Sequence, residues 1–178
     1  MKKILMILLA GVLALSLTGC MGGSANKETL VTLEVPEEGT PAAVAPNADQ
    51  YDADLAGLCA YMEAGGIIAA GEGYPVDTAY EVIGAMGGKR YKVSFNKSVI
   101  QAEFYEFDPE NLSAEAQALL ADAREQGQVT ILRNTVPARA SQDGKFMMIY
   151  IDPKTEEPDN AHRELAYSYF DNFCQKKQ

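Results

Sequence analysis

The sequence predicts an α+β fold, with a mainly antiparallel four-stranded sheet and helices packed against one face. Three observations predict it. Apolar residues recur at helical spacing in four segments, alternating segments occur in two pairs, and short polar turns join each pair. The elements follow the order α-α-β-β-α-β-β-α, which is typical of helices layered on an antiparallel sheet.

The first predicted helix ends at Gly65-Gly66. Its apolar stripe has the spacing i, i+3, i+4 and i+7 and consists of Leu55, Leu58, Cys59 and Met62. A second helix is predicted to begin at Pro75, because proline is favoured in the first turn, and to end at Gly87-Gly88. The stripe of this second helix is Val76, Ala79, Tyr80 and Ile83.

The next two strands are predicted to form a hairpin with Lys97-Ser98 as its loop. This register separates an apolar face from a polar face, and a slip of one residue would mix them. The apolar pairs are Phe95 with Ile100, Val93 with Ala102, and Tyr91 with Phe104. The polar pairs are Lys92 with Glu103, Lys89 with Glu106, and Arg90 with Tyr105. We expect the polar face to meet water.

Ser113 is predicted to cap a third helix that stops at Gly127. Two short segments follow, residues 128–132 and 136–140, and then Asp143-Gly144, which favours a two-residue primed turn. That turn pairs Ala140 with Met147, Ala138 with Ile149, and Val136 with Ile151. A last helix is predicted over residues 160–176, with an apolar stripe formed by Leu165, Ala166, Tyr169, Phe170 and Phe173.

The N-terminal segment has the pattern of an export signal. Lys2-Lys3 precede an apolar run that is too short to span a bilayer, and Leu17-Thr18-Gly19-Cys20 closes it. These four residues resemble the lipobox of bacterial lipoproteins. The resemblance covers about twenty residues and implies cleavage after residue 19, a diacylglyceryl thioether on Cys20 and, in many bacteria, an acylated new N-terminus. It therefore implies a chain anchored in the cell membrane by lipid and exposed on the extracytoplasmic side.

The expected organisation is a cleaved signal at residues 1–19, a lipidated cysteine with an acidic tether at 20–48, and one domain at 49–178. Glycine and spaced prolines prevent a stable helix in the tether. Residues 29–35 alternate weakly, so an edge strand is an alternative to plain tether there.

The charge of the chain is strongly acidic, with a net −10 that becomes more negative once Lys2 and Lys3 are removed. This balance disfavours nucleic acid as a partner and favours solubility.

Besides Cys20, the chain has two further cysteines, Cys59 and Cys174. Export permits a disulfide between these two, and burial as free thiols is the alternative.

No motif predicts catalysis, a metal site or a cofactor. His162 is the only histidine, and Cys59 lies within an apolar stripe rather than at a helix start. The acidic residues Glu156, Glu157 and Asp159 lack the spacing of a calcium loop, so we expect a solvated acidic surface.

One candidate binding face is predicted on the side of the sheet away from the helices. Its members are large apolar or aromatic residues and one arginine, namely Tyr105, Phe107, Arg139, Phe146, Met148 and Tyr150. Such residues on a solvated sheet face need a cover, so the alternative is internal cover by a helix or by residues 29–35. The functional expectation is a non-enzymatic lipoprotein that binds an envelope protein. The alternatives are a small-ligand or wall-glycan binder, and an envelope hydrolase built from carboxylates distant in sequence.

Overall fold

A long β-hairpin, formed by β3 and β4, lies at the centre of the fold. The computed structural model describes residues 30–36, 44–69 and 75–176. In these ranges, strands form one mixed sheet of order β1-β3-β4-β7-β6-β5, and β2 pairs with β3. The strands are β1 Val31–Thr32, β2 Val76–Asp77, β3 Gly87–Phe95, β4 Ser98–Glu106, β5 Gln128–Ile131, β6 Asn134–Ala140 and β7 Phe146–Ile151. Only β1 lies parallel to its neighbour among these pairs.

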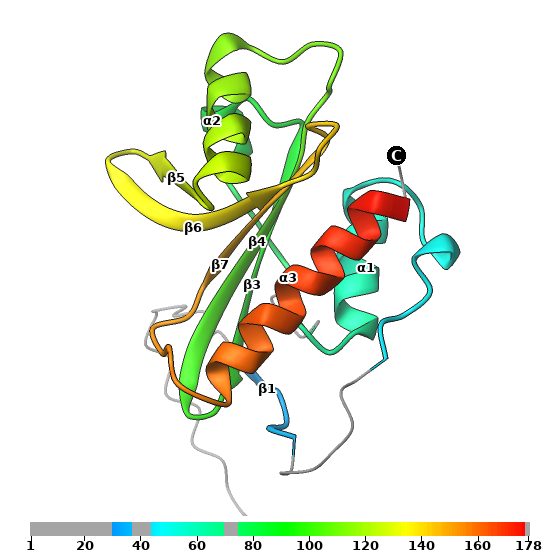
Figure 1. Ribbon diagram of the computed structural model, residues 1–178, viewed down its shortest axis with the longest axis vertical. Coiled ribbons are helices and arrows are strands. Elements are labelled where there is room, and N and C mark those ends of the chain that lie inside the picture. The colour runs from blue at the N-terminus through cyan, green and yellow to red at the C-terminus, as the bar shows by residue number, and fades with distance from the viewer. Residues whose placement is uncertain (1–29, 37–43, 70–74, 177–178) are drawn as a thin grey trace, which may run out of the picture.

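The helices lie on both faces of the sheet (Figure 1). They are α1 Leu55–Ala64, α2 Ala114–Glu125 and α3 Asp159–Lys176, and the 3-10 turns are η1 Ala48–Gln50 and η2 Tyr80–Ile83. In Figure 1, α1 and α3 lie side by side, and α2 packs beside β5 and β6. None of the helices in the described ranges is both long enough and apolar enough to cross a bilayer.

The α+β class is confirmed, but the expected four-stranded antiparallel sheet, its single covered face and the element order are wrong. Two apolar cores flank the sheet instead of one. The first joins α1 and α3 to residues such as Phe95, Phe104 and Tyr150, and the second joins α2 to residues such as Met147 and Ile149. Because successive strand residues face opposite sides, β7 contributes to both cores and is buried along nearly its whole length.

The edge-strand alternative describes residues 29–35 better than plain tether does. Val31 and Thr32 pair in parallel with Val93 and Ser94, and Leu33 donates its backbone N–H to the Ser94 carbonyl at 2.8 Å. Residue 29 itself lies outside the described ranges. The segment that reads as tether therefore extends the sheet.

The helix expected to start at Pro75 is not formed. Val76 and Asp77 pair with β3 instead, the Thr78 N–H donates to the Gly88 carbonyl, and a 3-10 turn follows. Gly87 and Gly88, expected to end the helix, begin β3. Backbone hydrogen bonds to a strand therefore override the helical spacing of the apolar residues in this segment.

The turn of the β3–β4 hairpin lies one residue earlier than expected. Asn96 and Lys97 both have positive φ, of 44° and 61°, which is the geometry of a two-residue primed turn. Val93 consequently pairs with Ile100 rather than with Ala102, and Arg90 pairs with Glu103. The shift changes each partner by two residues, so the predicted apolar pairs and the residues Arg90, Lys92, Glu103 and Tyr105 keep their faces. Lys89 and Glu106, expected on the polar face, instead lie on the face that α1 covers, where Lys89 pairs with Phe104 and Glu106 accepts a hydrogen bond from the Leu55 N–H.

The other local predictions match more closely. Ser113 caps α2 as predicted, accepting a hydrogen bond from the Ala116 N–H, and Asp54, which was not predicted as a cap, accepts one from the Gly57 N–H at the start of α1. The expected pairs Ala138 with Ile149 and Ala140 with Met147 are confirmed. Their loop is wider than the predicted Asp-Gly turn, since Ser141 donates its N–H to the Phe146 carbonyl.

The first turn of α3 buries polar groups. His162 Nδ1 lies 2.6 Å from the Tyr150 hydroxyl, and its ring stacks on Phe95 with centroids 4.3 Å apart. Asp159, expected in a solvated acidic loop, is fully buried and accepts a hydrogen bond from Asn96. Burial lowers the pKa of His162, although the nearby Asp152 and Asp159 oppose this shift.

This burial predicts an acid-sensitive contribution to stability. The pKa of His162 is lower in the folded chain than the ordinary value of 6.5, so the unfolded chain binds the proton more strongly. The contribution is therefore complete above about pH 6.5 and decreases as the pH falls toward the folded pKa. Urea unfolding of the wild type and of His162→Gln between pH 5 and 8 measures it. The wild type should lose more stability on acidification than the variant, and parallel curves would contradict the assignment.

Candidate functional site

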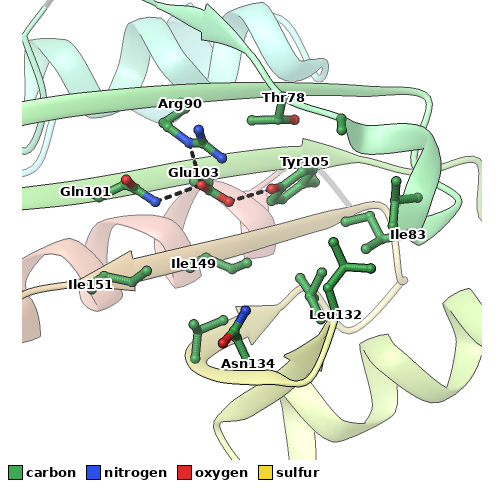
Figure 2. A pocket seen from close by; sticks show the side chains of 14 residues that line it. Thr78, Ile83, Arg90, Gln101, Glu103, Tyr105, Leu132, Asn134, Ile149 and Ile151 are labelled. Atoms are coloured by element: carbon green, nitrogen blue, oxygen red, sulfur yellow. Dashed lines mark hydrogen bonds and ion pairs between the residues drawn. The ribbon is translucent and has the colours of Figure 1, made fainter.

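A buried polar network lies on the sheet face that carries α2. Glu103, only 5% exposed, accepts three hydrogen bonds from side chains of β3 and β4. Arg90 Nε donates to Oε1 at 2.6 Å, Gln101 Nε2 donates to Oε1 at 2.9 Å, and the Tyr105 hydroxyl donates to Oε2 at 2.5 Å. Figure 2 shows this network at the base of a pocket.

Strand geometry brings these side chains together. Gln101, Glu103 and Tyr105 alternate along β4 and so lie on one face, and Arg90 stands directly opposite Glu103 in the hairpin register. A buried carboxylate without partners is costly, and three donors including a guanidinium offset that cost. Burial also raises the pKa of Tyr105, and its hydrogen bond to the Glu103 carboxylate adds to the shift. The network is therefore a set of fixed donors and acceptors.

The pocket above this network has a volume of about 240 Å³. One part of the lining is polar, and the other part is aliphatic and includes Ile149 and Ile151 of β7, which Figure 2 labels, together with Val136 of β6. The lining residues are Thr78, Ala79, Val82, Ile83, Arg90, Gln101, Glu103, Tyr105, Ile131, Leu132, Asn134, Val136, Ile149 and Ile151. This combination of an apolar wall with a few convergent polar groups is typical of small-molecule sites, although most are larger.

Two exposed apolar residues stand at the rim. Val82 of η2 is 58% exposed and Leu132, in the turn between β5 and β6, is 77% exposed. Leu132 and Arg133 both have positive φ, of 47° and 71°. A bulky residue seldom adopts this conformation, because its Cβ crowds the backbone. The turn therefore holds a leucine at the pocket mouth at some conformational cost.

Thr78 and Gly88 shape the polar end of the pocket. Thr78 is 9% exposed, and its Oγ1 is enclosed by the protein. Its hydroxyl lies close to Gly88, where a Cβ atom would come within 2.1 Å of Thr78 Oγ1 and 2.9 Å of the Tyr105 ring. Glycine at position 88 therefore makes the room that Thr78 and Tyr105 occupy.

The residues of the sequence-predicted binding face are not gathered on one surface. Phe146, Met148 and Tyr150 are buried in the first core, whereas Tyr105 and Phe107 are buried in the second core on the opposite face. Arg139 donates to Asp171 of α3 at 2.9 Å and stacks over the Tyr167 ring. The alternative, internal cover by helices, thus accounts for the apolar residues of this face. Of its six residues, only Tyr105 lines the pocket above the Glu103 network.

Cys59 and Cys174 are both buried as free thiols. Cys59 is hydrogen-bonded to Tyr91, and burial raises its pKa to about 11. Burial raises the pKa of Cys174 as well, and nearby Asp143 and Asp171 add to that shift. Protonated, enclosed thiols are poor nucleophiles, and His162 lies near the start of α3 whereas Cys174 lies near its end. Cys20 lies outside the described residues.

Sequence reasoning missed the pocket because it assigned the polar face of the hairpin to water. The alternation of Gln101, Glu103 and Tyr105 was visible, but the expected register placed Lys92, not Arg90, opposite Glu103. An aromatic residue within this polar run was the available signal that something covers the face. No grouping of three or more His, Cys, Asp or Glu side chains suited to a metal occurs within the described ranges.

The close contacts of Gly88 predict a measurable cost of filling its site. Gly88→Ala should lower the free energy of unfolding by about 1–3 kcal/mol, because the added methyl group displaces Thr78 and the Tyr105 ring. Gly87→Ala is the matched control, since the only near contact of its Cβ is a flexible Leu55 methyl group at 3.1 Å. Urea unfolding of both variants gives the comparison. Equal losses would mean that the crowding at position 88 is relieved elsewhere.

The comparisons with known proteins give no relative. No family model matches this chain, and no curated protein or solved structure shows significant similarity to it. The chemistry of the pocket must therefore be read from its own residues.

Proposed function

We propose that this chain is a lipid-anchored binding domain of a bacterial cell envelope that takes a small ligand in the pocket between η2 and the β5–β6 turn. The observation that carries this proposal is the buried network around Glu103 at the base of a pocket with aliphatic walls. It replaces the expected protein-binding face, whose large residues are used in the two cores.

Several features support a ligand site rather than structural packing. The polar groups sit on the central strands β3 and β4, which hold them rigidly. The aliphatic wall remains open beside them instead of being filled by a side chain from η2 or β5. Exposed Val82 and Leu132 at the mouth would lose contact with water when a ligand is bound, which favours binding.

The lipid anchor rests on the lipobox-like Leu17-Thr18-Gly19-Cys20. Two or more acyl chains would hold the chain durably to the membrane, since each buried methylene contributes about 0.8 kcal/mol.

Anchoring is tested by Cys20→Ser. In an expressing bacterium fed an alkyne-tagged palmitate, the wild type should carry the label and fractionate with membranes, because the thioether forms on this sulfur. Cys20→Ser should lose the label completely. Cys59→Ser is the matched control: it replaces a different cysteine by serine and should keep the label. Labelling of Cys20→Ser would contradict the anchor.

Ligand binding is tested with a small-fragment library screened by ligand-observed NMR against the full chain in detergent. Ile151→Trp should weaken the fragments that bind in the pocket by about tenfold or more, because the indole occupies the space above β7. Val99→Trp is the matched control, since Val99 is 45% exposed on β4 and does not line the pocket. If no fragment distinguishes the two variants, the pocket is not the binding site.

A further inference from the structure

The hydrogen-bond partners of Arg90 leave most of its guanidinium available. Its Nε donates to Glu103, and among the described residues no hydrogen bond from its two Nη groups is found. The Arg90 side chain is 39% exposed and lines the pocket. A guanidinium held through Nε still presents its terminal edge, on which two parallel N–H groups match a carboxylate.

Glu103 orients the Arg90 guanidinium by accepting the hydrogen bond from its Nε. Its carboxylate already accepts hydrogen bonds from Gln101 and Tyr105 in addition to Arg90, so three of its roughly four acceptor sites are filled. The carboxylate is consequently a poor partner for a cationic ligand. The polar half of the pocket therefore has hydrogen-bond donors without a partner among the described residues, and these are the Arg90 Nη groups.

The other half of the pocket selects the body of the ligand. Its walls are branched aliphatic side chains, and the main ones are Val136, Ile149 and Ile151. Tyr105 is the only aromatic residue among those that line the pocket, and its ring packs against Gly88. A sugar ring would lack a stacking surface there, whereas a short alkyl chain is complementary to these walls and to a volume of about 240 Å³.

From these two halves we infer that the pocket binds a short-chain aliphatic carboxylate, whose carboxylate pairs with the terminal edge of Arg90 and whose chain lies on Ile149 and Ile151. This inference rests on the proposed function and names the ligand class of the same site. The alkyl chain extends toward Val82 and Leu132 at the mouth of the pocket.

The experiment compares hexanoate, hexanamide and hexylamine as probes of equal chain length. Each is titrated into the full chain in detergent, and binding is followed by NMR line broadening at pH 7. Hexanoate should bind at least about tenfold more tightly than the amide, because the charge-assisted pair is lost, and the amine should not bind.

Two arginine variants locate the carboxylate. Arg90→Lys keeps the charge beside Glu103 but removes the planar fork, and it should weaken hexanoate by about tenfold. Arg133→Gln is the control for long-range charge, since Arg133 is in the turn at the mouth but does not line the pocket. The probe comparison on the wild type needs no variant, so a poorly folded Arg90→Lys would not remove the test.

The outcomes separate this inference from the proposed function. If hexanamide or hexylamine binds as tightly as hexanoate and Ile151→Trp weakens that binding, the inferred recognition of a carboxylate is wrong, but the pocket is still a ligand site. If hexanoate binds Arg90→Lys and Ile151→Trp as tightly as the wild type, it binds elsewhere and the pocket is not the site. Failure of all three probes while fragments still distinguish Ile151→Trp from Val99→Trp would overturn the ligand class alone.

Discussion

The register of the β3–β4 hairpin is the constraint on which both faces of the sheet depend. The positive φ angles of Asn96 and Lys97 fix a two-residue turn, and every pair along the two strands follows from it. One face receives the apolar residues that α1 and α3 cover. The other face brings Arg90 opposite Glu103. A turn one residue later would keep both faces but separate this pair by two residues, and the buried carboxylate would lose its guanidinium.

The parts of the fold that could be predicted from the sequence are those fixed by local signals. The cap Ser113 and the apolar stripes define α1 and α2, and alternation fixes the pairing of β6 with β7. Strands β1 and β2 are two residues long and exist through hydrogen bonds to β3; weak alternation alone marks β1, and the helical spacing around β2 predicts the wrong element. The positive φ of Lys97 has no sequence signature either, which is why the turn was misplaced. Of the residues that line the pocket, only Tyr105 was predicted as part of a binding face, because the assignment of the others depends on what covers the polar face.

A buried ion pair is weak evidence for stability, since desolvation of the two charges offsets most of their attraction. The position of the Arg90–Glu103 pair suggests what it contributes instead. The hydrogen-bonded network keeps a polar surface beside the aliphatic lining of the pocket. The positive φ angles of Leu132 and Arg133 are a second local cost in free energy, and this turn lies at the mouth of the same pocket. Two such costs around one pocket favour a function for it over a packing defect.

The pairing of Val31 and Thr32 with β3 has a consequence for how far the domain can stand from a membrane. Val31 and Thr32 belong to the segment counted as tether up to position 48, and their pairing with β3 fixes them to the sheet. If Cys20 carries the proposed lipid, nine residues separate it from Leu30, the first described residue, and ten peptide steps reach at most about 35 Å when fully extended. The pocket would then sample a layer close to the bilayer surface, where amphipathic molecules that partition into lipid are more concentrated than in bulk water.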